Sequence, residues 1–169
     1  MLPSNRDAAF RDLYEWLGVA NEPRLDDLLV RVQVLANRTY SPDVVLVIMK
    51  IVEHLGKIVE GELPAELDAL RGKAWLPAQG KADRWYRPGE LFASNRSHIF
   101  HTQALFLDMR GASEQVNRFL KEGLMIRFEP TVSLVIQHLL YCCDKAISVH
   151  PEVYRFLNDK AEDPALNLL

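Results

Sequence analysis

Two histidines three positions apart are the first candidates for chemistry in this sequence. His98 and His101 would lie on one face if residues 97–101 were helical, and two imidazoles there could ligate a metal ion. Two ligands are too few for a metal site, and Asp108 or Glu90 would complete it only if the fold brought them close. We therefore predict no metal site and no other cofactor, and we expect polar or surface roles for both histidines.

The other reactive side chains lack the neighbours that catalysis needs. His54 and His138 lie in apolar helical stretches, where a histidine usually has one hydrogen-bond partner. Cys142 and Cys143 are adjacent, so a disulfide between them would be strained, and we expect reduced core residues. Ser133 lacks the flanking glycines of a nucleophile elbow. Because no nucleophile, base and oxyanion donor occur together, we predict that the chain is not an enzyme.

The strongest local electrostatic signal is a basic stretch interleaved with aromatic residues. This combination binds single-stranded nucleic acid, because the cations follow phosphates and the rings stack on bases. The same residue types also anchor protein partners, and a simpler interpretation is a hairpin held on the helices by its indole ring. The predicted interaction surface consists of Arg71, Lys73, Trp75, Lys81, Arg84, Trp85, Tyr86, Arg87, Phe92 and Arg96.

The elements that position these residues include a repeated unit: a helix ending in glycine, a proline, and a second helix with an apolar stripe. In the first copy Gly18 and Pro23 precede the stripe of Leu25, Leu28, Leu29 and Val32. In the second copy Gly123 and Pro130 precede the stripe of Val132, Val135, Ile136 and Leu139. Both stripes have the i, i+3, i+4, i+7 spacing of one helix face. A repeat of packing elements with no catalytic signature between the copies indicates a scaffold or interaction module.

The remaining elements complete a predominantly helical α+β fold. Ser41, Pro42 and Asp43 predict the start of a helix over 44–59 that is apolar on most sides and should lie at the centre of a bundle. A short helix should follow over 63–72. Residues 74–77 and 85–87 predict a small β-hairpin, whereas strand and helix both remain open for 103–110. We expect two helical subregions bridged by this hairpin.

Length and composition favour one globular domain. The chain has 169 residues, of which 49% are hydrophobic and 25% charged, and its net charge of −3 predicts no general affinity for polyanions. We divide the domain into a helical part over 1–72, a hairpin and aromatic-rich connector over 73–110, and a helical part over 111–169. The start lacks the layout of a signal peptide and no apolar run could span a bilayer, so we expect a cytoplasmic protein without a membrane partner.

The order of several motifs resembles that in internal modules of very large proteins such as sacsin and the plant protein NO VEIN. The motifs are Trp16-Leu17-Gly18-Val19, Pro23, Trp75-Leu76-Pro77, Arg87-Pro88-Gly89-Glu90-Leu91-Phe92, and Gly123-Leu124 with Pro130. They extend over most of the chain. The second copy departs from the pattern, because Met125 and Ile126 follow Leu124 and the gap to its proline is longer.

This resemblance implies an accessory region that accompanies a chaperone-type ATPase domain elsewhere in a larger protein. Consistent with that, the sequence has no glycine-rich phosphate-binding loop. The apolar tail over 164–169 either packs on the body or marks the chain as a fragment. We expect a non-catalytic protein-interaction or scaffold module, whose partner is another protein or a neighbouring domain of the same polypeptide. The alternative is a nucleic-acid-binding accessory module that uses the basic, aromatic hairpin.

Overall fold

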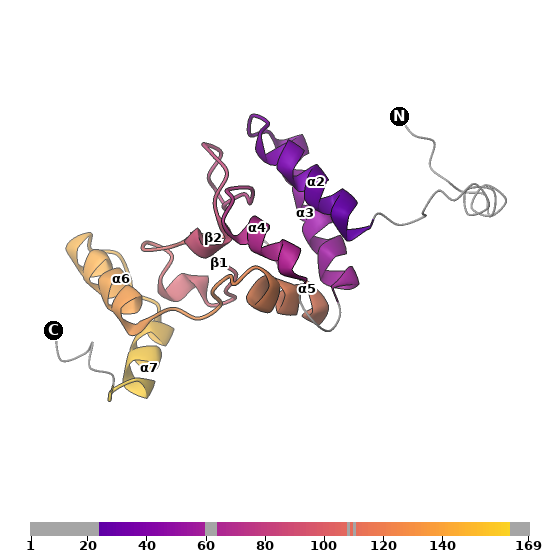
Figure 1. Ribbon diagram of the computed structural model, residues 1–169. Coiled ribbons are helices and arrows are strands. Elements are labelled where there is room, and N and C mark those ends of the chain that lie inside the picture. Colours follow the sequence, from indigo (N-terminus) through magenta and orange to yellow (C-terminus); the bar gives the residue numbers. More distant parts are fainter. Residues whose placement is uncertain (1–23, 60–63, 108, 110, 163–169) are drawn as a thin grey trace, which may run out of the picture.

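The computed structural model describes residues 24–59, 64–107, 109 and 111–162, and these residues form a predominantly helical α+β fold (Figure 1). The α-helices are α2 (Leu25–Ala36), α3 (Pro42–Ile58), α4 (Asp68–Arg71), α5 (Glu114–Arg118), α6 (Val132–Asp144) and α7 (Pro151–Asp159). Shorter turns are η1 (Ala65–Leu67), η2 (Pro88–Glu90), η3 (Ser97–Ile99) and the π-helical η4 (Phe119–Gly123). The strands are β1 (Leu91–Phe92) and β2 (Leu105–Phe106). The predicted fold class is confirmed, while Trp16, Gly18, Pro23 and the tail over 164–169 lie outside the described residues.

Capping residues set the helix starts that the sequence predicts. The side chain of Ser41 accepts a hydrogen bond from the backbone N–H of Val44 at 3.4 Å, and Pro42 occupies the first turn of α3. Thr131 caps α6 in the same way, through the N–H of Leu134 at 3.3 Å. The short helix predicted over 63–72 is the pair η1 and α4. In the part of the chain that is described, none of the helices combines the length and apolar character needed to cross a bilayer.

The larger hydrophobic core lies between α2, α3, α5 and the connector. The apolar stripe of α2 is buried there, and from α3 come Ile48, Ile51, Val52 and Leu55. The prediction that helix α3 lies at the centre of a bundle is wrong, because Leu46 is 57% exposed and Val47 is 37% exposed. The reason is that α2 and α5 pack against only part of its surface.

A second core joins the connector to α6 and α7. It consists of Phe92, Ile99, Phe100, Phe106, Val132, Val135, Ile136, Val153 and Phe156. The rings of Phe92, Phe100 and Phe106 meet edge-on or tilted, with centroids 5.0–6.2 Å apart. The second copy of the repeated unit is thus divided, because α5 and η4 pack in the larger core whereas the buried stripe of α6 packs in this one.

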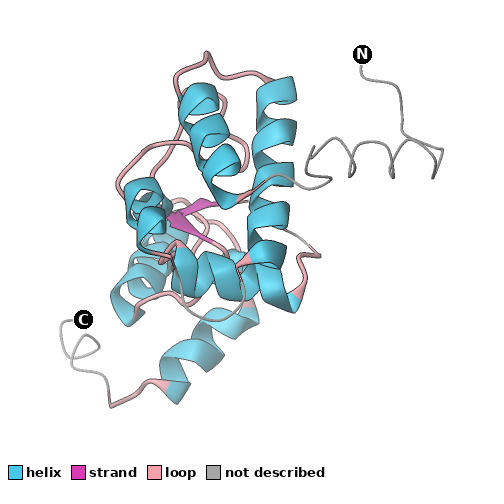
Figure 2. Cartoon of the chain, turned by 45° about the vertical axis from the view of Figure 1, so that its right-hand side comes forward, coloured by secondary structure: helices cyan, strands magenta, loops and turns pink. Residues whose placement is uncertain are grey.

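The predicted hairpin is present but shorter than a regular pair of strands. Leu76 and Tyr86 form one antiparallel bridge, in which each backbone N–H donates to the other's carbonyl at 3.1 and 2.8 Å. The ladder stops there, and the backbone N–H of Gln79 donates instead to the carbonyl of Phe106 at 2.7 Å. The two-stranded sheet is instead parallel and joins β1 to β2, with Leu91 opposite Leu105 (Figure 2). Strand β2 resolves the ambiguity over 103–110 in favour of a strand at Leu105–Phe106.

Candidate functional site

The aromatic members of the predicted interaction surface are core residues. Trp75, Trp85, Tyr86 and Phe92 are each at most 8% exposed. The indole N–H of Trp75 donates to the carbonyl of Leu70, and that of Trp85 donates to the carbonyl of Arg38, both at 3.0 Å. The two indoles therefore fasten the hairpin to the ends of α4 and α2, as the simpler interpretation of the sequence expects.

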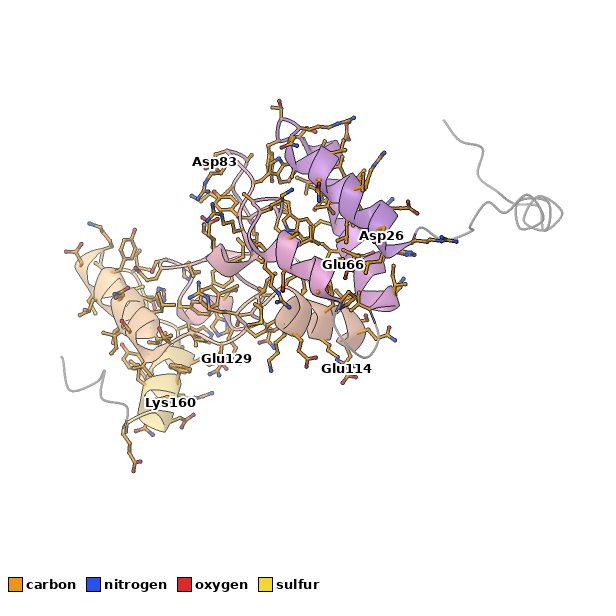
Figure 3. The ribbon with its side chains drawn as sticks, viewed as in Figure 1. Asp26, Glu66, Asp83, Glu114, Glu129 and Lys160 are labelled. Atoms are coloured by element: carbon orange, nitrogen blue, oxygen red, sulfur yellow. The ribbon has the colours of Figure 1, made fainter. Side chains whose placement is uncertain are left out.

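The basic members of this surface divide into two groups. Arg71 binds the carboxylate of Asp68 and the carbonyl of Gly123, Arg84 pairs with Glu90 at 2.9 Å, and Arg96 lies 3.7 Å from Glu129. Lys73, Lys81 and Arg87 are exposed and form no ion pair with any described residue. Figure 3 shows Asp83 on the loop of the hairpin, where its carboxylate accepts from the hydroxyl of Tyr86 at 2.8 Å.

His98 and His101 do not share a helix face. The helical turn η3 ends at Ile99, so His101 lies beyond it. The ring of His101 lies 4.9 Å from that of His138, and its Nδ1–H donates to the carbonyl of His98 at 3.3 Å. The Nε2 atom of His98 instead lies against the carboxylate of Glu152. Of the two acids that sequence reasoning offered as further ligands, Glu90 is held at the hairpin by Arg84 and Arg87, and Asp108 lies outside the described residues.

The fold brings His98, His150 and Glu152 together, and we call these three residues the histidine–glutamate cluster. One ligand atom of each lies within 4.8 Å of the others, and the rings of His98 and His150 are 4.5 Å apart. His150 caps α7, because its Nδ1 accepts the backbone N–H of Glu152 at 3.2 Å. The hydrogen bond with His98 holds the pKa of the Glu152 carboxyl below its usual range, and electrostatic interactions with His98, Arg96 and His150 act in the same direction.

Sequence reasoning missed His150 and Glu152, because they lie more than 50 positions from His98. The available signal was local. Pro151 marks the start of a helix, so His150 occupies its N-cap and Glu152 its first turn. That pattern could have identified both residues as neighbours, but nothing in it points to His98.

His138 is a buried neutral histidine. It is 1% exposed, and its Nδ1 lies 2.7 Å from the hydroxyl of Thr102. The side-chain amide of Gln103 donates to the Thr102 oxygen at 3.1 Å, and the Nε2 of His138 lies 3.7 Å from the sulfur of Cys142. The hydrogen-bond partner expected of a histidine in an apolar helix is thus found for His138, whereas the buried Nε2 of His54 has no hydrogen-bond partner among the described residues. Cys142 is a buried free cysteine as expected, whereas Cys143 is exposed and the prediction of a core residue is wrong there.

Acidification should destabilise the protein through His138. Burial, and secondarily the charge of His101, lower its pKa from the usual 6.5, so the unfolded chain binds this proton more readily. The contribution of neutral His138 to the free energy of unfolding is fully present above about pH 6.5 and is lost as the pH falls below that value. The loss is at most about 1.4 kcal/mol per pH unit. Urea unfolding at about pH 7.5 and about pH 5.5 should show this loss, and His138→Gln should show a smaller one. An equal loss in both proteins would contradict the assignment.

An apolar groove of about 540 Å³ lies beside the first half of α3. We call it the α3 groove. One side is formed by Tyr40, Pro42, Val45, Leu46 and Met49, and the other by residues 77–82 of the hairpin loop. Lys81 is the one charged residue among those that line it.

The groove exists because α3 has two apolar stripes. Its buried stripe begins at Ile48, and the groove-lining stripe begins at Pro42, each with the i, i+3, i+4, i+7 spacing. The two stripes differ in phase by about 120° on the helix surface. The first faces the core, whereas Leu46 in the second remains 57% exposed. The α3 groove is therefore an apolar helix face that the described residues leave partly uncovered.

Comparisons of the chain with protein-family models, with curated proteins and with solved structures found no match.

Proposed function

We propose that this chain is a non-catalytic protein-interaction module, and that the α3 groove binds an amphipathic helix of a protein partner. The observation that carries the proposal is the second apolar stripe of α3, with Leu46 57% exposed at its centre. Exposed apolar surface has a cost in water, and helix-in-groove recognition uses a stripe of this spacing.

The charge at the groove indicates the chemistry of the partner. Lys81 lines the groove, is exposed, and forms no ion pair with the described residues. A carboxylate on the partner could pair with it at the rim, where such contacts favour association rate and orientation more than affinity. We therefore propose a helix with apolar residues at i, i+3 or i+4 spacing and an acidic residue beside them.

Nucleic-acid binding has weaker support. The four aromatic side chains that would stack on bases are at most 8% exposed, so stacking would require the hairpin to open. Three of the basic side chains are engaged by Asp68, Glu90 and Glu129. The exposed cations Lys73, Lys81 and Arg87 suit a protein surface as well as a phosphate backbone.

The setting of the module is also a proposal. The order of motifs from Trp16 to Pro130 supports a place within a larger chaperone-type protein of the sacsin kind, where nucleotide hydrolysis would belong to another domain. A cytoplasmic location fits that setting and the two cysteines, neither of which is in a disulfide.

Peptide display on the immobilised protein tests the proposed function. A library of helical peptides is selected on the unmodified chain, and the enriched peptides are then tested on Leu46→Glu, which introduces a charge into the α3 groove. Enriched peptides should combine the apolar spacing with an acidic residue, and Leu46→Glu should weaken their binding by at least about tenfold, or about 1.4 kcal/mol.

The matched control is Val30→Glu, because Val30 is 61% exposed on α2 and does not line the groove. It should bind the selected peptides like the unmodified chain. Peptides that bind all three proteins equally, or a selection without groove-dependent enrichment, would contradict the proposed groove. Circular dichroism of the three proteins establishes that the substitutions leave the fold intact.

A further inference from the structure

We propose that the histidine–glutamate cluster of His98, His150 and Glu152 is a zinc site. Two imidazole nitrogens and one carboxylate oxygen form a donor set that zinc binds in proteins, with a fourth position left for water or a partner's side chain. Calcium and magnesium prefer oxygen ligands throughout and do not fit two histidines. The cluster lies apart from the α3 groove, so this inference is independent of the proposed function.

The geometry of the cluster requires only a small adjustment to hold the ion. Four-coordinate zinc with bonds of about 2.0–2.1 Å separates its ligand atoms by roughly 3.3 Å. The three ligand atoms here already lie within 4.8 Å of one another. The side chains of His98 and Glu152 are 39% and 35% exposed, so they have room to move and an ion can enter from solvent.

Each ligand atom has a lone pair that the ion could take. The Nε2 of His98 and the carboxylate of Glu152 share a proton or hydrogen bond that zinc would replace. In His150 the Nδ1 lone pair accepts the N–H of Glu152 at 3.2 Å, at the long end of the range for hydrogen bonds, and zinc bound at Nδ1 would replace that bond. Metal binding therefore competes with protons and should weaken as the pH falls.

The surrounding charges permit a cation. Arg96 acts on Glu152 electrostatically but is paired with Glu129, whose carboxylate lies 3.7 Å from the guanidinium. These three side chains together carry a net charge of −1 when ionised. The ring of His101 turns away toward His138, so it does not compete for the same ion.

The consequence of zinc binding would be a link between two parts of the chain. His98 belongs to η3 in the connector, whereas His150 and Glu152 start α7. An ion held by all three residues would fix the start of α7 to the connector at the edge of the second core. Zinc should then raise the resistance of the folded protein to urea in proportion to its affinity.

Calorimetric titration of zinc chloride into the chelator-treated full chain tests the site, with Cys143→Ser in every protein because Cys143 is an exposed thiol. One equivalent should bind, and His98→Gln, His150→Gln and Glu152→Gln should each weaken binding by at least about tenfold. The matched control His101→Gln removes a nearby exposed histidine and should bind like the parent. Absence of zinc binding, or binding that the three variants leave unchanged, would overturn the proposal.

Nuclear magnetic resonance of the histidine ring nitrogens provides a readout that needs no ligand variant. Zinc should shift the signals of His98 and His150 and leave those of His54 and His138 in place. Shifts confined to other histidines would overturn the proposal even if a variant failed to fold.

Discussion

Replacing Trp75 with alanine should lower the free energy of unfolding by about 3–5 kcal/mol. Its side chain is fully buried in the larger core. The substitution removes a fully buried indole and leaves a cavity between α4 and the hairpin. It also leaves the carbonyl of Leu70 without the indole N–H that it accepts at 3.0 Å. Since a domain of this size is stable by about 5–15 kcal/mol, the variant should be close to unfolding.

Urea unfolding monitored by circular dichroism measures this effect. Trp75→Phe separates the two causes, because it keeps most of the apolar contact and removes only the hydrogen bond and part of the volume, so its loss should be intermediate. Tyr154→Ala is the control, since Tyr154 is a large aromatic residue that is 56% exposed on α7. A loss for Trp75→Ala no greater than that for Tyr154→Ala would show that the indole does not hold the hairpin to α4.

Local signals predicted the helix starts well, because each depends on a few neighbouring residues. Ser41 and Pro42 begin α3 where the sequence places it, and the stripe that begins at Val132 is buried in α6. A capping hydroxyl, a proline with fixed φ and an apolar period act within one or two turns. Sequence alone therefore accounts for the helical character of the described chain.

Pairings between distant segments could not be predicted in the same way. Strands β1 and β2 have two residues each, which is too short for an alternating pattern to develop. Their parallel register requires the intervening residues 93–104 to bring β2 back beside β1. The N–H of Leu107 then donates to the carbonyl of Phe92 at 2.9 Å. The predicted hairpin was a local pairing and is present as one bridge.

The candidate sites could not be predicted either, because they too depend on contacts between distant segments. Basic and aromatic residues alternate over 71–96, but the alternation does not distinguish rings that stack on a ligand from rings that anchor the hairpin in the core. The burial of Trp75 and Trp85 shows that their rings anchor the hairpin in the core. The spacing of His98 and His101 suggested one shared site, yet η3 ends at Ile99 and the two rings contact different histidines, His150 and His138. The α3 groove depends on residues from two segments, so only the fold could reveal it.

Gly56→Ala should destabilise the protein by about 1–3 kcal/mol, although alanine is the better helix former by about 1 kcal/mol. A Cβ at this position of α3 would lie 2.8 Å from both the Cα and the Cγ2 of Val116 in α5. Rotation of the valine side chain could relieve the second contact, but the first is with backbone. The two helices would have to separate at this contact, which loosens the larger core.

The control for this prediction is Gly72→Ala at the end of α4. Gly72 has right-handed helical dihedral angles, with φ of −81°, and its Cβ would meet no atom within 4 Å. That substitution should therefore be neutral or stabilising by about 0.4–1 kcal/mol, because it reduces the entropy of the unfolded chain. Thermal unfolding of both variants separates the two effects. If Gly56→Ala were as stable as Gly72→Ala, α3 and α5 could not approach as closely as described.

Gly56→Val should be less stable than Gly56→Ala, because two further methyl groups would meet the same backbone.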